Sequence, residues 1–215
     1  MCPSTPDTVH HPIFARMYQR ISVAAEDTGV AEHRGRLLAG LTGRIVEVGA
    51  GNGLNFAHYP TAVTEVIAVE PEPFLRARAI EASVDARVAV TVLAGTADRL
   101  PVADESADAG VASLVLCSVP DQRSALAELR RVIRPGGELR FYEHVAAIDP
   151  RWSRWQRRVD PVWTRVAGGC HLNRDTSAAI AHAGFEVVEV DRFLFQTCWL
   201  SKLAAPHVLG RARRY

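Results

Sequence analysis

A glycine-rich turn at residues 44–53 is the first stretch whose residue types and spacing suggest ligand chemistry. Residues 45–48, which are apolar except for Glu47, lead into Gly49, Gly51 and Gly53, and a short helix is predicted from residue 54. Glycine tolerates positive φ and has no Cβ, so the backbone amides of such a turn can approach a ligand at a helix start. The spacing differs from the G-x-G-x-x-G dinucleotide motif, which disfavours an NAD-binding oxidoreductase.

A carboxylate follows the next predicted strand. Residues 65–69 form a largely apolar run that ends at Glu70, 17 residues after Gly53. A carboxylate at the tip of a strand can accept hydrogen bonds from both ribose hydroxyls of a nucleoside. A glycine-rich turn alone is often only a structural turn, but its combination with Glu70 favours a nucleoside site.

The pattern Glu47-x-Gly49-x-Gly51-x-Gly53 resembles the first motif of the class I S-adenosylmethionine-dependent methyltransferases. This resemblance implies that the cofactor is S-adenosylmethionine and that the product is S-adenosylhomocysteine. The cofactor-binding residues that it implies around the turn and the second strand are Glu47, Gly49, Ala50, Gly51, Gly53, Glu70 and Pro71.

Two further segments extend this resemblance. Residues 94–101 are similar to the family's adenine-binding loop, although Thr96 stands where aspartate is usual. The resemblance implies adenine contacts from Thr96 and Ala97, with Asp98 as an alternative contact or as a loop carboxylate at a helix start. Tyr18, in a helix predicted from residue 12, is expected either to cover the methionine end of the cofactor or to be part of the core.

The elements that must position these residues alternate along the chain. We predict strands at 44–48, 65–69, 88–93, 109–119, 138–143, 185–190 and, more weakly, 193–200; helices are predicted at 12–23, 32–41, 54–59, 73–82, 122–133 and 176–183. Such alternation predicts right-handed crossovers and a parallel sheet. The family resemblance implies a Rossmann-like α/β fold with a seven-stranded, mostly parallel sheet, an antiparallel C-terminal hairpin and helices on both faces. Residues 206–210 are expected to pack back on that sheet.

The length of 215 residues predicts one domain. Within it we expect N-terminal helices and a lid at 1–41, of which residues 1–11 form a loose leader, and a cofactor-binding core at 44–145. A substrate-side insertion, including turns at 160–161 and 168–175, is expected at 146–176, and a C-terminal helix and strands at 177–215.

The acceptor side is expected beyond the carboxyl ends of the strands, where doubly wound sheets bind ligands. Leu114, Cys117 and Ser118 follow the fourth strand and are expected to line the sulfonium and the acceptor entrance, although Cys117 also fits an inert buried cysteine. The insertion supplies an expected apolar wall of three tryptophans, Trp152, Trp155 and Trp163.

The titratable pair at the end of the fifth strand gives the best general-base candidates. We expect His144 to accept a proton and Glu143 to orient it, with His171 as a second candidate; the alternative for each histidine is a structural role.

A narrower resemblance extends into the acceptor half. Residues 114–119, 134–137, 143–147, 160–163, 169–174 and 206–210 resemble the methyltransferase-like proteins that S-methylate alkyl thiols and hydrogen sulfide. This resemblance implies in-line methyl transfer to a thiolate. O- or C-methylation of a phenol, quinol or natural-product intermediate remains an alternative, as does a non-enzymatic S-adenosylmethionine-binding module. At the N-terminus, where the animal proteins carry a hydrophobic membrane segment, this sequence has only polar residues and a short amphipathic helix, so the resemblance does not imply membrane attachment.

Composition sets the remaining expectations. Charge is balanced, with 25 basic and 24 acidic residues, and gives no general argument for nucleic-acid binding. Arginines at 151–165 and 211–214 are expected to form solvated faces, with contact to a membrane surface or an anionic substrate as the alternative. Cys2, Cys117, Cys170 and Cys198 lack a C-x-x-C pair, so no metal site is expected. Without 18 consecutive apolar residues, we expect no integral membrane segment. Widely spaced cysteines are most simply reduced thiols in a cytoplasm, so a cytoplasmic location is expected. We further expect a small-molecule acceptor and a monomer or homodimer.

Overall fold

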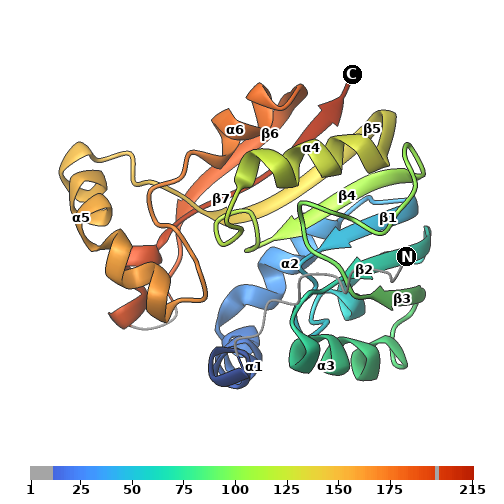
Figure 1. Cartoon of the computed structure of the whole chain (residues 1–215), viewed down its shortest axis with the longest axis horizontal. Helices are drawn as coiled ribbons and strands as arrows, with labels where there is room; N and C mark the ends of the chain where they lie inside the picture. The colour runs from blue at the N-terminus through green and yellow to red at the C-terminus, as the bar shows by residue number, and fades with distance from the viewer. Residues whose placement is uncertain (1–11, 197–198) are drawn as a thin grey trace, which may run out of the picture.

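The computed structural model describes residues 12–196 and 199–215 and contains a seven-stranded mixed sheet (Figure 1). The strand order is β3-β2-β1-β4-β5-β7-β6, and β7 runs antiparallel to both of its neighbours while β1 to β5 pair in parallel. The predicted fold class is therefore confirmed. The strands are β1 Gly43–Val48, β2 Val63–Val69, β3 Ala89–Leu93, β4 Ala107–Ser113, β5 Ile133–His144, β6 Phe185–Leu194 and β7 Pro206–Arg214.

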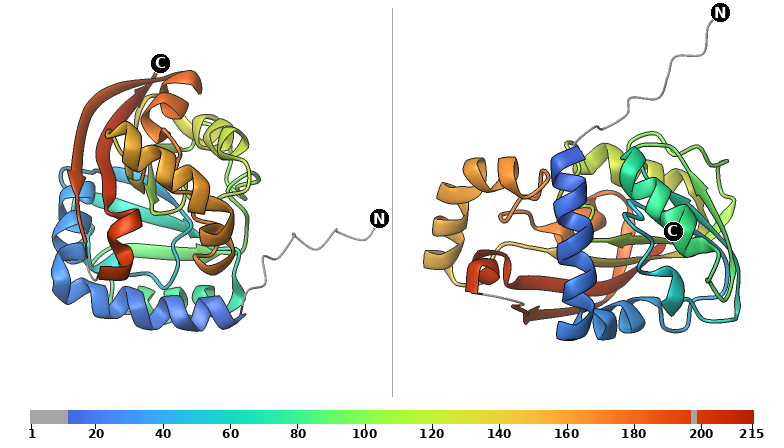
Figure 2. Two further views of the ribbon diagram at one scale, coloured as in Figure 1. Left: turned by 90° about the vertical axis from the view of Figure 1, so that its left-hand side faces the viewer. Right: turned by 90° about the horizontal axis from the view of Figure 1, so that it is seen from below.

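Helices cover both faces of the sheet (Figure 1). One face packs against α2 (Ala31–Leu38) and α3 (Pro73–Ser83), and the other against α4 (Gln122–Val132) and α6 (Thr176–His182). On α4, Leu126, Leu129 and Val132 recur at helical spacing and are fully buried, which explains why the helix packs on this side. The remaining helices, α1 (Pro12–Ala25) and α5 (Pro150–Val166), lie near the carboxyl ends of the strands; Figure 2 shows α1 crossing below the sheet and α5 beyond its end.

The register brings the carboxyl ends of three central strands to one edge. Val48 pairs with both Val69 of β2 and Ala112 of β4, so the loops that follow these strands begin side by side. The strand order reverses between β1 and β4, which is the position where open α/β sheets bind ligands.

The C-terminal hairpin differs from the prediction. The last strand is β7 at Pro206–Arg214, whereas a strand at 193–200 was expected; Trp199–Ala204 forms a 3-10 helix, and residues 197–198 lie outside the described residues. The sequence did not predict a strand at 211–214, because a run of arginines is typical of a solvated surface segment. Two of them also form ion pairs: Arg211 Nε lies 3.1 Å from Glu189, and Arg214 Nη2 lies 2.8 Å from Glu105.

Three other boundaries also differ. Strand β4 ends at Ser113 instead of 119 because Leu114 adopts a positive φ of 57°, which breaks the extended conformation. The segment 54–59 contains only a 3-10 turn at Phe56–His58. No turn forms at Asp160-Pro161, because α5 continues through Pro161. The predicted leader at 1–11 lies outside the described residues. Among the helices of the described part of the chain, none combines the length and apolarity needed to cross a bilayer.

Candidate active site

The glycine turn after β1 is held against the end of β2. The amides of Gly49 and Ala50 both donate to the carbonyl of Val69, at 2.8 and 3.2 Å. Gly49, Gly51 and Gly53 have φ values of +65°, +58° and +80°, which L side chains rarely adopt. The sequence motif therefore reflects a backbone conformation that these three positions require.

Gly49 also has no room for a side chain. A Cβ at this position would lie 2.4 Å from Cγ2 of Val115, which follows β4. We predict that Gly49→Ala lowers the free energy of unfolding by about 2–4 kcal/mol, because it combines positive-φ strain with overpacking. Gly136→Ala is the matched control: its φ is +78°, but no atom of the described residues lies within 4 Å of where its Cβ would stand. Urea denaturation should show a markedly smaller loss for the control, and equal losses would contradict the crowding argument.

Glu47 lies beneath this turn and is 1% exposed. Its carboxylate accepts hydrogen bonds from Asn55 Nδ2 and the Tyr59 hydroxyl, both at 2.7 Å. Burial raises the pKa of Glu47 to about 7, against the lowering effect of these hydrogen bonds. Glu47 thus anchors the segment that follows the turn, and no sequence pattern indicated its two partners.

A polar chain connects this anchor to the N-terminal helices. Arg34 Nη1 donates to Asn55 Oδ1 at 2.8 Å, and Arg34 Nε donates to Glu26 at 2.9 Å. Tyr18 of α1 lies over the turn, with its ring 3.4 Å from where a Cβ of Gly51 would stand. The helices that precede β1 therefore lie on the glycine turn, at the position expected for a lid.

Glu70 lies beside the turn at the end of β2 and is 5% exposed. Its Oε2 accepts from the amide of Gly51 at 2.7 Å, and its Oε1 accepts from the amide of Glu72 at 2.9 Å. Each oxygen keeps a further lone pair, because a carboxylate offers about four acceptor positions. Burial raises the pKa of Glu70, while the two amide hydrogen bonds lower it.

The other cofactor candidates surround this region. Thr96 and Ala97 are half-buried in the loop after β3, and Thr96 forms a bridge with Arg99, whereas Asp98 is exposed. Pro71 is half-buried beside Glu70, and its carbonyl accepts from Arg76 Nη1 at 2.9 Å.

The loop after β4 is held by Glu143, which is fully buried. Its carboxylate accepts from the amides of Val115, Leu116 and Cys117 at 3.1, 2.9 and 2.9 Å. The expectation that Glu143 orients His144 is therefore wrong, because consecutive strand residues point to opposite faces. Glu143 instead fixes the loop that begins at Leu114, whose amide donates to the Tyr142 carbonyl at 2.6 Å.

His144 lies against two cysteines. Its Nδ1 is 3.7 Å from Sγ of Cys117 and 3.5 Å from Sγ of Cys170, and the two sulfur atoms are 3.8 Å apart. The hydroxyl of Ser118 lies 3.5 Å from the sulfur of Cys117. The sequence suggested His144 and Cys117 separately, but not Cys170 as their common neighbour.

His171 lies next to this cluster in the chain but is bound elsewhere. Its Nδ1 lies 2.7 Å from Asp160 Oδ2 of α5, and Asp160 Oδ1 accepts from the Leu172 amide at 2.7 Å. The backbone amide of His171 donates to the Cys117 carbonyl at 2.8 Å. His171 thus ties the loop after α5 both to the helix and to the loop after β4.

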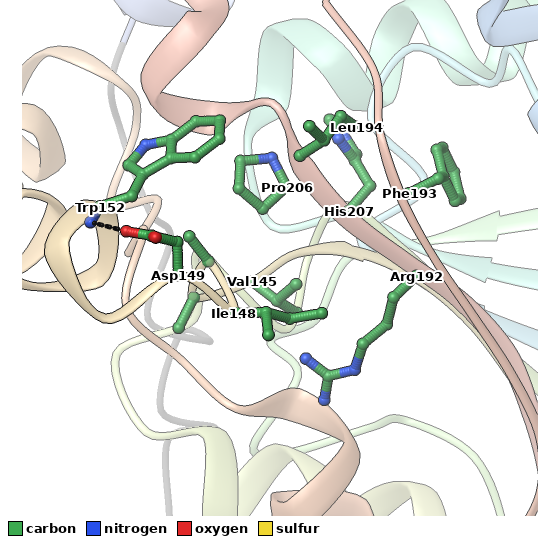
Figure 3. Close-up of a pocket in the computed structure, with 11 residues that line it drawn as sticks. Val145, Ile148, Asp149, Trp152, Arg192, Phe193, Leu194, Pro206 and His207 are labelled. Carbon is green, nitrogen blue, oxygen red and sulfur yellow. Dashed lines mark hydrogen bonds between the residues drawn. The ribbon is translucent and has the colours of Figure 1, made fainter.

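A pocket of about 240 Å³ lies beyond the end of β5, beside the end of β6 and the start of β7 (Figure 3). Trp152 lies on one side and Phe193 on the other, and His207 also lines it. The His207 ring centroid is 4.5 Å from that of His144. The ring of His207 therefore lies between the pocket and the cluster formed by His144, Cys117 and Cys170. The three tryptophans do not form one wall, since Trp155 is 53% exposed and only Trp152 of the three lines this pocket.

Comparisons with known proteins agree with this architecture. Residues 46–141 match the model of the methyltransferase domain family. The chain is 35% identical to thiol S-methyltransferase TMT1B of Homo sapiens over 181 residues, covering 81% of this chain and 73% of that protein. It is 30% identical to a demethylmenaquinone methyltransferase of Paenarthrobacter aurescens, covering 64% and 48% respectively. The structure of N-methyltransferase NodS from Bradyrhizobium japonicum with S-adenosylhomocysteine superposes with a TM-score of 0.65 at 18% identity, covering 86% of each chain.

Proposed function

Because this chain belongs to the class I S-adenosylmethionine-dependent methyltransferases, we propose that it methylates the sulfur of a small thiol. The observation that carries the proposal is the 35% identity to a thiol S-methyltransferase over 81% of the chain, which extends past the cofactor half into the acceptor half.

The described residues fit S-adenosylmethionine. A buried carboxylate with free lone pairs, Glu70, stands beside a turn whose glycines leave the backbone uncovered. We assign the ribose hydroxyls to Glu70, with Pro71 beside it, and the adenine to Thr96 and Ala97. The methionine part is assigned to the turn at Gly49, Ala50, Gly51 and Gly53, under Tyr18 and beside Leu114. Glu47 acts on the turn through its hydrogen-bonded partners.

The cofactor supplies an electrophilic methyl group on a sulfonium sulfur. The chain must then hold an acceptor in line and favour its nucleophilic form. The thiol of free cysteine has a pKa near ~8.5, so its ionisation requires much less assistance than that of an alcohol. We assign this task to the site that contains His144, whose Nδ1 faces Cys117 and Cys170. Cys117 and Ser118 border the acceptor sulfur, and His171 holds the surrounding loop through Asp160.

The pocket beside His207 is assigned to the organic part of the acceptor. Its lining is largely apolar, with Val145, Ile148, Trp152, Phe193 and Leu194, which suits an alkyl or aryl group. Trp155 is not assigned to it because of its exposure, and Trp163 lies outside the lining.

The test is S-adenosylhomocysteine release with hydrogen sulfide, alkyl thiols and aryl thiols, each carbon skeleton paired with its phenol, quinol or alcohol. We expect kcat/KM for each thiol to exceed that of its oxygen counterpart by at least about 100-fold, because a thiol ionises far more readily than the matching hydroxyl. Turnover confined to phenols or quinols would contradict thiol methylation and favour the quinone-type acceptors of the more distant relative. Cofactor binding without turnover of any acceptor would favour a non-enzymatic module.

A further inference from the structure

Three metal-ligating side chains from three separate segments meet at the carboxyl edge of the sheet. Cys117 comes from the loop after β4, His144 from the end of β5, and Cys170 from the loop after α5. Their ligand atoms all lie within 4.8 Å of one another, and the two cysteines are free and buried. Soft thiolate and imidazole donors in this combination are those that Zn²⁺ prefers.

The separations match those of a tetrahedral zinc site. Zinc binds thiolate sulfur at about 2.3 Å and imidazole nitrogen at about 2.0–2.1 Å, which places two sulfurs about 3.8 Å apart and a sulfur and nitrogen about 3.6 Å apart. The observed values are 3.8 Å between the sulfurs and 3.7 and 3.5 Å from sulfur to Nδ1. We propose that Cys117, His144 and Cys170 bind a Zn²⁺ ion, and that the fourth coordination position receives the sulfur of the thiol acceptor.

The surrounding structure holds these donors in place without the ion. The Cys117 amide is fixed by Glu143 at 2.9 Å, and the loop that carries Cys170 is tied to the loop of Cys117 by the hydrogen bond from the His171 amide to the Cys117 carbonyl. Gly169 is packed so closely that a Cβ would lie 2.8 Å from the Ser118 carbonyl oxygen. These contacts orient the ligands before the ion binds, so the ion needs to order little of the surrounding chain.

Before an acceptor thiol enters, the charges of the proposed site balance. Two thiolates and one Zn²⁺ sum to zero, and a neutral imidazole adds none, so the ion can be buried without a further counter-ion. Because cysteine binds zinc as the thiolate, binding of the ion releases the thiol protons to solvent.

Three protein ligands leave one position open, as in catalytic zinc sites. This inference rests on the proposed thiol methylation. An acceptor R–SH that enters the open position loses its proton to solvent and becomes a zinc-bound thiolate. A sulfur lone pair then forms the new S–CH3 bond while the carbon–sulfonium bond breaks, and its electrons remain on the sulfur of S-adenosylhomocysteine. The thioether product is a weaker ligand than the thiolate and can leave.

The first experiment measures zinc in the full-length protein purified under reductant. We expect about one Zn²⁺ per chain and at least about a 100-fold loss of zinc affinity in Cys117→Ser and in Cys170→Ser, since each variant removes one of three ligands. The matched control is His182→Gln, which removes an exposed histidine whose Nδ1 contacts the Ala178 carbonyl of its own helix, α6. S-adenosylmethionine affinity serves as the check that each variant is folded.

The second experiment replaces zinc with Co²⁺, whose absorption reports coordination. We expect a tetrahedral spectrum with thiolate-to-cobalt charge transfer, and we expect addition of a thiol acceptor without S-adenosylmethionine to change it, whereas the matched phenol leaves it unchanged. Absence of bound metal, or equal metal binding by the cysteine variants, would overturn the site. A cobalt spectrum indifferent to thiols would overturn the open position.

Chelation separates this inference from the proposed function. We expect thiol methylation to fall at least about 100-fold in the zinc-free protein and to return with added Zn²⁺, because the metal supplies the thiolate. Undiminished thiol methylation by zinc-free protein would overturn the catalytic metal while leaving thiol methylation in place. Methylation of phenols alone, with zinc bound, would instead overturn the proposed function.

Discussion

Replacement of Glu70 with glutamine is expected to weaken S-adenosylmethionine binding by about 100-fold, measured by isothermal titration calorimetry. The carboxylate stands at the end of β2 with one amide on each oxygen, from Gly51 and from Glu72. A glutamine would turn an NH2 group toward one of those amides and lose the charge that strengthens hydrogen bonds to ribose. Hydrogen bonds to charged groups contribute about 1.5–3 kcal/mol each, and about 2.7 kcal/mol corresponds to 100-fold in affinity.

Glu65→Gln is the matched control for this prediction. Glu65 lies on the same strand, where it is partly exposed and paired with Arg44 at 3.0 Å. Surface ion pairs of this kind contribute about 0–1 kcal/mol, so the control should keep its cofactor affinity within about twofold. If Glu70→Gln also binds the cofactor as tightly as the unmodified protein, the ribose assignment is wrong.

The cofactor-binding half could be predicted because the residues that indicate it lie close together in the sequence. The glycines at 49, 51 and 53 and the acid at 70 are close in sequence, and each follows an apolar strand whose end is visible from the residue pattern. Parallel strand register then brings the two segments together, since Val48 pairs with Val69. The family resemblance and the strand–helix alternation thus predicted the central sheet and the position of the turn.

The acceptor side was less predictable because its contacts are distant in sequence. Cys170 meets Cys117 across 53 residues and His144 across 26 residues, so the absence of a C-x-x-C pair says nothing about whether they lie together. The adjacency of Glu143 and His144 suggested a catalytic pair, but strand geometry sends the two side chains to opposite faces. The packing of the insertion determines which of its residues lie close to the rest of the site. A local sequence pattern does not predict such packing.

The link from the N-terminal helices to the glycine turn could not be predicted either. Arg34 and Asn55 carry no motif, yet they join Glu26 of the helical segment to Glu47 beneath the turn. Buried polar groups of this kind must all be satisfied, so their partners are determined only when the fold is complete. The position of the helical segment at Glu26 and of α2 beside the turn therefore follows from packing and from this hydrogen-bonded chain.

Replacement of His144 with alanine is expected to lower kcat for a thiol acceptor by about 100–1,000-fold, the range for loss of proton-transfer or metal assistance. The affinity for S-adenosylmethionine should stay within about threefold, because the contacts of the His144 ring are with the cysteines and His207 and not with the glycine turn. His182→Ala, on the exposed side of α6, is the control and should retain both. Steady-state kinetics and calorimetry measure the two quantities, and loss of cofactor binding would remove His144 from the acceptor site.

The pH dependence of that variant decides between a proton-accepting and a metal-binding His144. An acceptor whose thiol has the pKa of free cysteine, near ~8.5, is mostly ionised by a pH of about 9.5, so it then needs no base. If His144 only accepts a proton, His144→Ala should recover most of its activity as the pH rises through this range. If His144 binds zinc, the variant lacks the ion that holds and orients the acceptor sulfur, and the deficit persists at high pH. We expect the deficit to persist, because Nδ1 faces both cysteine sulfurs. Its distances to them match the nitrogen–sulfur distances expected in a zinc site.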